Sequence, residues 1–180
     1  MIKIGFWNIN GMGEEKINDP DFKNIINQYD IICLTETWGK EKNEINAVTE
    51  NMFPGYTGKM RNRKNKHKKA KRNSGGILVL YKYALENYIT VTGKKDQNIL
   101  WLKINESVVG ESIILGTVYI SPEHSTTYDN KTMTEHTFTT LSKHIASFDK
   151  ESIIIIGGDF NARTGMLLDF IDTTIRKYTK

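Results

Sequence analysis

The hydrophobic and polar positions along the chain predict strands and helices that follow one another. Residues 2–9 alternate in part between apolar and polar side chains and are rich in β-branched residues, which is typical of a strand. Asp19 and Pro20 supply a helix N-cap and a first helical residue, and a helical apolar period then predicts a helix over 20–29. Residues 30–35 form a continuous apolar run, as expected for a strand buried on both faces.

The rest of the sequence predicts mainly strands, followed by one more helix. Short runs rich in Ile, Val, Leu, Tyr and Trp predict strands at 75–81, 88–92, 99–104 and 112–120. A capping-box spacing at Thr132 and Glu135, followed by apolar residues at steps of three and four, predicts a helix over about 132–148. The four isoleucines of 152–156 predict a fully buried strand. Without an internal repeat or a domain linker, this pattern indicates one layered α/β domain over residues 1–180.

Composition narrows the class of protein. The chain has 180 residues, of which 38% are hydrophobic and 26% charged, as in ordinary soluble domains. No apolar run approaches the roughly 20 residues that span a bilayer, so we expect no membrane segment. The N-terminus lacks the pattern of a secretion signal, so we expect a nuclear or cytoplasmic protein that is not secreted. Cys33, the lone cysteine, is interpreted as a small buried hydrophobic residue rather than a reactive thiol.

The positive charge is concentrated in one segment. The net charge is +4, yet residues 61–72 contain eight basic residues and no acidic one, and the other 17 basic residues are outnumbered by 21 acidic ones. We interpret 59–73 as an exposed basic loop. It could follow a nucleic-acid backbone, serve as a nuclear-localisation signal, or be a solvated insertion without a partner. The candidate nucleic-acid-binding residues are Arg61, Arg63, Lys64, Lys66, Lys68, Lys69, Lys71 and Arg72.

Polar residues at the ends of predicted strands could carry chemistry. They are Asn8 and Asn10, Glu36, Tyr119, and Asp159 with Asn161. Glu36 could bind a hard cation such as Mg²⁺, or it could be a helix cap or surface acid. Asp159 could accept a proton from water, with Asn161 orienting that water, or the two could form only an Asx-turn. Two glycines before Asp159 would let the backbone turn tightly and approach a ligand.

Five motifs in order carry a resemblance to a known family. They read Trp-Asn-x-Asn-Gly, Leu-Thr-Glu-Thr-Trp, Ser-Gly-Gly-Ile-x-Val-x-Tyr, Tyr-x-Ser-Pro and Gly-Asp-Phe-Asn-Ala-Arg-Thr-Gly. Together they resemble the endonuclease/exonuclease/phosphatase superfamily, and most of all the apurinic-type endonuclease domain of non-LTR (LINE-like) retrotransposons. Apurinic repair enzymes carry an Asp where this chain has Asn10, whereas retrotransposon members have an Asn there. The resemblance implies a four-layer α/β sandwich, with two packed mixed sheets flanked by helices.

The resemblance also implies a role for each candidate residue. Glu36 would bind Mg²⁺ or Mn²⁺, with Asn10 nearby. Asn8 and Asn161 would orient groups around the scissile phosphate, and Tyr119 would contact that phosphate. Asp159 would align or activate the attacking water. The implied activity is metal-dependent nicking of DNA by the complete domain.

The family pattern continues beyond the last motif and closes on Ser-Asp-His. Only 19 residues follow Asn161, and they contain no histidine. We therefore expect a domain that is incomplete at its C-terminus, that lacks the C-terminal strands, and that is inactive by itself. The four histidines of the chain are interpreted as surface residues. Two alternatives stay open, a catalytically dead nucleic-acid-binding fragment and a superfamily phosphatase or phosphodiesterase that acts on a lipid or an RNA.

Overall fold

The chain forms two packed four-stranded sheets, each with helical segments on its outer face. The computed structural model describes residues 1–39, 52–62, 75–121 and 132–161, and for 132–136 it describes the backbone alone. Sheet A has the strand order β1 (Ile4–Asn8), β2 (Ile31–Thr35), β4 (Ile77–Lys82), β3 (Tyr56–Arg61). Sheet B has the order β5 (Ile89–Thr92), β6 (Ile99–Ile104), β7 (Ile113–Tyr119), β8 (Ile153–Asp159). The helices are α1 (Glu14–Asn18), α2 (Pro20–Ile26), α4 (Glu106–Val109), α5 (Thr132–Ala146) and the 3₁₀ helix η1 (Tyr83–Tyr88).

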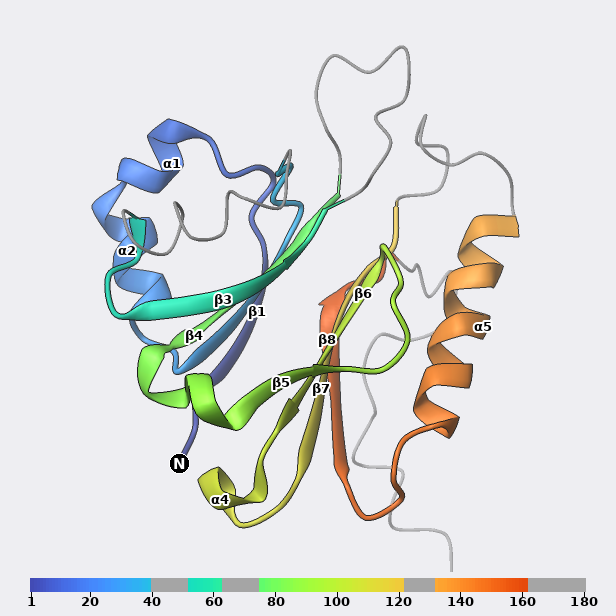
Figure 1. The fold of residues 1–180 in the computed structure, drawn as a ribbon. Coiled ribbons are helices and arrows are strands. Elements are labelled where there is room, and N and C mark those ends of the chain that lie inside the picture. Colours follow the sequence, from blue (N-terminus) through green and yellow to red (C-terminus); the bar gives the residue numbers. More distant parts are fainter. Residues whose placement is uncertain (40–51, 63–74, 122–131, 162–180) are drawn as a thin grey trace, which may run out of the picture.

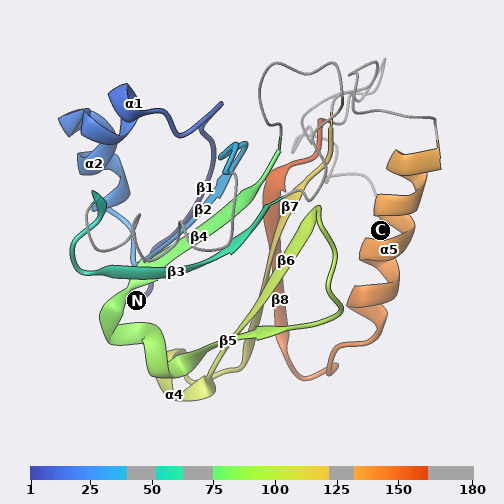
Figure 2. The same cartoon turned by 45° about the horizontal axis from the view of Figure 1, so that its top comes forward.

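The elements stack in four layers, as the sequence predicted. Figure 1 shows α1 and α2 outside sheet A and α5 outside sheet B, with the two sheets between them. The view in Figure 2 shows the same order of layers. Both sheets are mixed, because β1–β2 and β7–β8 are parallel pairs while the other neighbours are antiparallel. Each parallel pair is joined by a helical crossover, as parallel strands require.

Side chains alternate between two cores along each strand. On β2, Ile31 and Cys33 face the other sheet, while Ile32 and Leu34 pack beneath α1 and α2. Both faces are buried, and all of β2 is enclosed, which confirms the prediction for this continuous apolar run. The same alternation on β7 directs Leu115 toward sheet A.

The layer between sheet B and α5 contains a histidine that the sequence did not place in the core. Trp101 is 1% exposed and donates from Nε1 to Nδ1 of His144 at 3.0 Å. His144 is 5% exposed, so its interpretation as a surface residue was wrong. One turn of helix separates it from Leu141 and Phe148, which pack into the same cluster, so the helical period had in fact placed it on the buried face. The side chains of the other three histidines lie outside the described residues.

Strand β8 is less enclosed than the sequence predicted. Its residues are half-buried and Ile153 is 43% exposed, because β8 lies at the edge of sheet B and pairs only with β7 among the described residues. A continuous apolar run therefore identified a strand and overestimated its burial. Strand β1 has the corresponding edge position in sheet A.

Several elements differ from the prediction. Strand β3 was not predicted, because its sequence contains a glycine and two basic residues, and part of it had been interpreted as loop. Lys59 and Arg61 thus belong to a strand, whereas residues 63–73 of the proposed basic loop lie outside the described residues. The short helices α1, α4 and η1 were not predicted either. Within the described parts of the chain, no helix has the length and apolar character needed to cross a membrane.

Candidate active site

The space between the sheets changes from apolar to polar at one end. The parallel pairs β1–β2 and β7–β8 all finish at this end, where Asn8 is the register partner of Thr35 and Tyr119 is the partner of Asp159. Farther from the strand ends, the inward faces of β2 and β7 carry Cys33 and Leu115, which belong to the apolar core between the sheets. Because side chains on one face of a strand recur every second residue, the polar side chains follow directly on this core. The four strand ends predicted to carry chemistry therefore meet.

Asp159 is held by two donors from different elements. Its Oδ2 accepts from Nδ2 of Asn8 at 2.6 Å, and its Oδ1 accepts from the backbone N–H of Asn161 at 2.9 Å. The second bond is the Asx-turn expected from sequence, and the first shows that the turn alone does not account for this residue. An ionised carboxylate has about four acceptor positions, so two remain for water or a metal.

Two more asparagine contacts extend this group. Oδ1 of Asn8 accepts from the backbone N–H of Asn10 at 2.9 Å, and Nδ2 of Asn161 donates to the carbonyl of Ile120 at 2.6 Å. Asn8 is therefore used at both ends of its amide, which fixes its orientation. Asn8, Asn10 and Asn161 are exposed, so a ligand can reach the group from solvent.

Glu36 is joined to the second sheet through Tyr119. The tyrosine hydroxyl donates to Oε1 of Glu36 at 2.6 Å, and Tyr119 is 4% exposed. The backbone of Glu36 is held as well, since its carbonyl accepts from the N–H of Gly11 at 2.6 Å. Glu36 is half-buried, and its Oε2 atom makes no hydrogen bond with the described residues. Its carboxylate is thus positioned by one oxygen and free to bind a cation with the other.

Left-handed backbone conformations gather at this end of the molecule. The positive-φ residues other than glycine in the described chain are Asn10 (46°), Glu36 (55°), Trp38 (56°) and Asn161 (44°). Three of these are candidate site residues. Such conformations cost roughly 1–3 kcal/mol each, and they are common at catalytic and ligand-binding sites, where the surrounding structure maintains them. The fourth, Trp38, packs its ring over Gly11, where any side chain would overlap it.

The glycine before Asp159 allows close packing between β7 and β8, and the predicted close approach to a ligand stays a prediction. Gly158 has a φ of 133°, and a Cβ there would overlap the carbonyl of Val118 on β7. Only glycine permits this conformation together with such a close approach between strands. The Gly-Gly pair therefore sets the path by which β8 brings Asp159 to the site.

The donor set fits a hard divalent cation. Glu36, Asn10 and Asp159 offer carboxylate and amide oxygens, the ligands that Mg²⁺ and Mn²⁺ prefer. The parts of the chain that the structure describes contain no group of three or more His, Cys, Asp and Glu side chains arranged to hold a metal. Mg²⁺ commonly binds through one or two carboxylates and retains several waters, so a site of few protein ligands agrees with its coordination chemistry.

Of the eight basic candidate residues, Arg61 is the one inside the described chain. It ends β3 and is half-buried, and burial lowers the pKa of its guanidinium while Asp96 raises it. The other seven lie outside the described residues. Cys33 lies in the core below Thr35, where burial raises the pKa of its thiol to about 12 and the Thr117 hydroxyl opposes that rise. This agrees with its interpretation as a buried, unreactive residue.

Trp38 was not predicted to belong to the site. The signal was available, since Trp38 lies two residues after Glu36, but a tryptophan beside a strand usually belongs to the core. Its contact with Gly11 links the loops after β1 and β2.

Comparisons with known proteins agree on one family and one fold. A model of the Endonuclease/Exonuclease/phosphatase family matches residues 5–173. No curated protein matches the sequence. The catalytic domain of human Nocturnin, solved with a bound sulfate anion, is 16% identical with a TM-score of 0.54, and the match covers 90% of this chain and 64% of that domain.

Two other solved structures have the same fold. A humanized D. rerio TDP2 is 15% identical with a TM-score of 0.57, and the match covers 91% of this chain and 64% of that one. An AP endonuclease from Archaeoglobus fulgidus is 18% identical with a TM-score of 0.52, and the match covers 89% of this chain and 58% of that one. This chain therefore spans less than two thirds of the length of these structures.

Proposed function

The chain belongs to the endonuclease/exonuclease/phosphatase family, and on that premise we propose that its site hydrolyses DNA phosphodiesters with the help of Mg²⁺ or Mn²⁺. In the complete domain the activity is nicking of DNA, of the kind found in the endonucleases of LINE-like retrotransposons. One observation carries the proposal. Two sheets bring an Asp–Asn pair and a Glu–Tyr pair to the same solvent-accessible end, each joined by a 2.6 Å hydrogen bond.

Asp159 is the proposed acceptor of a proton from the attacking water. Its two hydrogen bonds within the described residues come from N–H donors, which hold the carboxylate in place without supplying it with a proton. A carboxylate positioned in this way can orient a water and accept its proton as the phosphorus is attacked, a contribution of about 10²–10⁴ in rate. Asn8 and Asn161 fix its orientation, and their exposed amides contact phosphate oxygens.

Glu36 is the proposed metal ligand, with Asn10 beside it. When bound there, the metal would neutralise charge that develops on the phosphate and the leaving oxygen. Tyr119 holds the Glu36 carboxylate from below through its hydroxyl. The hydroxyl has a single proton to donate, so a hydrogen bond from Tyr119 to a phosphate oxygen would have to replace the one to Glu36. Its role as a phosphate contact stays a prediction.

DNA is the proposed substrate on three grounds. The ordered motifs most resemble those of retrotransposon endonucleases, the chain carries a dense basic segment over 61–72, and one protein of similar fold is an AP endonuclease. The family motif Ser-Asp-His does not occur in the sequence. Because catalytic groups that act together are strongly non-additive, we propose that these 180 residues bind metal and DNA but nick DNA weakly or not at all unless the missing motif is supplied.

The test compares two aspartates that share one local structure. Asp149 and Asp159 both accept from the backbone N–H two residues later, at 3.1 and 2.9 Å, but only Asp159 also accepts from Asn8. Nicking of supercoiled plasmid is measured with Mg²⁺ and with EDTA, for the chain alone and for the chain joined to the C-terminal part of a family member that contains Ser-Asp-His. We expect metal-dependent nicking by the joined protein, a loss of at least about 100-fold in Asp159→Asn, and no loss in Asp149→Asn.

Several outcomes would decide against parts of this proposal. Equal effects of the two substitutions would mean that Asp159 is only a turn residue. Binding of DNA without nicking by the joined protein would favour the catalytically dead binding domain. Strong nicking by the 180 residues alone would show that Ser-Asp-His is dispensable here.

A further inference from the structure

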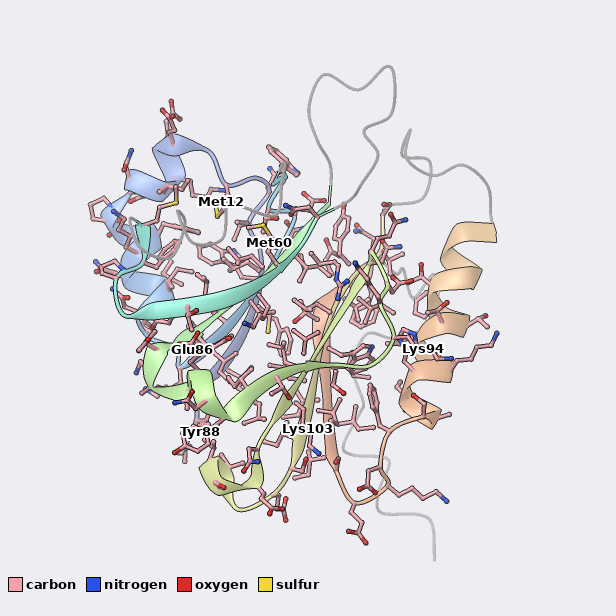
Figure 3. The ribbon with its side chains drawn as sticks, in the orientation of Figure 1. Met12, Met60, Glu86, Tyr88, Lys94 and Lys103 are labelled. Atoms are coloured by element: carbon pink, nitrogen blue, oxygen red, sulfur yellow. The ribbon has the colours of Figure 1, made fainter. Side chains whose placement is uncertain are left out.

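Arg61 faces the space between the two sheets. Strand β3 alternates, and Tyr56 and Met60 pack toward α2 in the cluster under the helices. Met60 is labelled in Figure 3 at the site end of β3. Arg61, the next residue, lies on the opposite face of the strand, toward the start of β6. The electrostatic influence of Asp96, which precedes β6, agrees with this placement.

Arg61 also lies level with the strand ends that carry the candidate site residues, as the pairing of strands in sheet A shows. Across sheet A, Arg61 on β3 pairs with Ile77 on β4, and Ile77 pairs with Thr35 on β2. Thr35 in turn pairs with Asn8 on β1, so the four residues lie side by side across the sheet. Neighbouring strands are about 4.8 Å apart, so Arg61 is roughly 10 Å from Thr35 and roughly 14 Å from Asn8 along this row. Glu36 follows Thr35 directly. The guanidinium therefore belongs to the end of the sandwich that carries the site.

One hydrogen-bond donor of Arg61, its Nε, is unused within the described residues. Its Nε is fully enclosed and has no hydrogen-bond partner among the described residues. Within the described residues, the ion pair is between Lys82 and Asp30, at the other end of these strands. Arg61 and Asp96 form no ion pair within 4.0 Å. Asp96 instead accepts from the backbone N–H of Asn98 at 2.7 Å. An enclosed N–H donor without a partner costs stability, which makes a purely structural role a poor account of it.

We propose that Arg61 binds a second phosphate of the substrate strand, beside the phosphate that is cut. This inference rests on the proposed function and names its substrate class as a polynucleotide. The planar guanidinium presents parallel N–H donors that match two phosphate oxygens, and its partial desolvation strengthens the contact. Successive phosphates of one DNA strand are separate anionic groups, so a polynucleotide can place a second one at Arg61 while the first lies in the site. A substrate with a single phosphodiester cannot occupy both positions.

The binding test compares Arg61→Gln with Lys103→Gln, which removes the same charge from an exposed position. Lys103, labelled in Figure 3, lies toward the end of sheet B remote from Met60. Affinity for a fluorescent duplex is measured by anisotropy in Ca²⁺ over a series of salt concentrations. We expect Arg61→Gln to weaken binding about three- to tenfold and to reduce the slope of log K against log salt by about 0.9, the value for one phosphate contact. Lys103→Gln should change neither quantity.

A third variant, Arg61→Lys, separates charge from geometry. It should keep the salt slope of the wild type and lose part of the affinity, because an ammonium lacks the paired donors of the fork. Arg61 has no phosphate contact if Arg61→Gln leaves the salt slope unchanged or weakens binding no more than Lys103→Gln. A thermal melt accompanies each variant, and Arg61→Gln should be at least as stable as the wild type because it removes the enclosed, unpaired Nε–H donor.

A hydrolysis arm distinguishes this inference from the proposed function. The joined protein described above is assayed on an oligonucleotide and on bis(p-nitrophenyl) phosphate, a diester with one phosphate. Arg61→Gln should raise KM for the oligonucleotide and leave kcat/KM for the small diester unchanged, whereas equal losses on both substrates would overturn the inference. If no variant hydrolyses either substrate, the proposed function fails, while the difference in DNA binding still decides the role of Arg61.

Discussion

Replacing Tyr119 with phenylalanine removes the hydroxyl that donates to Glu36 and leaves the ring in the core. The lost bond is short, at 2.6 Å, and its acceptor is a carboxylate. Bonds to charged groups contribute about 1.5–3 kcal/mol. Because Glu36 is half-buried, water replaces part of this contribution, and we expect Tyr119→Phe to lower the free energy of unfolding by about 1–2 kcal/mol.

Tyr81 provides a matched control in the same core. It is 0% exposed, it faces the same space between the sheets, and its hydroxyl has no hydrogen-bond partner among the described residues. Burial raises its pKa to about 12, so the hydroxyl stays protonated at neutral pH. Removing an unpaired buried hydroxyl relieves its desolvation, so Tyr81→Phe should be neutral or stabilising by up to about 1 kcal/mol.

Urea denaturation followed by circular dichroism measures both variants. With a slope of about 2 kcal/mol/M, Tyr119→Phe should lower the midpoint by roughly 0.5–1 M, and Tyr81→Phe should not lower it. A double-mutant cycle with Glu36→Ala isolates the pair, because the strain of a positive φ at position 36 cancels in the cycle. Equal midpoint shifts for the two tyrosines, or a coupling energy below about 0.3 kcal/mol, would show that the bond does not hold the site together.

Three further predictions concern the rest of the fold. His144→Ala should lower the free energy of unfolding, measured by urea denaturation, by about 3–4 kcal/mol, because it leaves a cavity and an unpaired Trp101 N–H in the core. The control Lys143→Ala, at an exposed position of the same helix, should change this free energy by less than about 0.5 kcal/mol. Hydrogen bonds from Lys82 and Lys3 lower the pKa of Asp30 below 3.8, so its stabilisation is present above that value and is lost as pH falls through the folded-state pKa. The stability gap between wild type and Asp30→Asn should therefore shrink as acid is added, and a constant gap would contradict this account. The Cys33 thiol, with a pKa of about 12, should react with a disulfide reagent at neutral pH only when the protein unfolds, and rapid labelling of the native protein would refute its burial.

Most of the fold could be predicted from local pattern. Residues 99–104 were predicted as a strand with the bounds that β6 has, and the helix over 132–148 differs from α5 by two residues. These elements have strong hydrophobic periods of their own. Strand β3 did not, because it is defined by pairing with β4 along its whole length rather than by its own residues. The exposure of β8 was also missed, since an apolar run shows that a strand forms and not how many neighbours it has.

The candidate site was predicted as a set of residues but not as a set of contacts. Period and motif order selected Asn8, Glu36, Tyr119 and Asp159 because each ends a strand. They could not show that Asn8 bonds to Asp159, since 151 positions separate the two in sequence. Neither could they show that the hydroxyl of Tyr119 is used by Glu36 or that Arg61 faces the same end.

The sequence by itself determined most of the strands, the main helices and the polar residues at the strand ends, because each depends on side chains a few positions apart. Only the tertiary structure decided which strand ends meet, which carboxylates are held by partners, and which buried donors have no partner among the described residues. The physical reason is that these properties arise from the register between strands and the packing of one sheet on another. Both depend on residues far apart in the chain, so no local pattern records them.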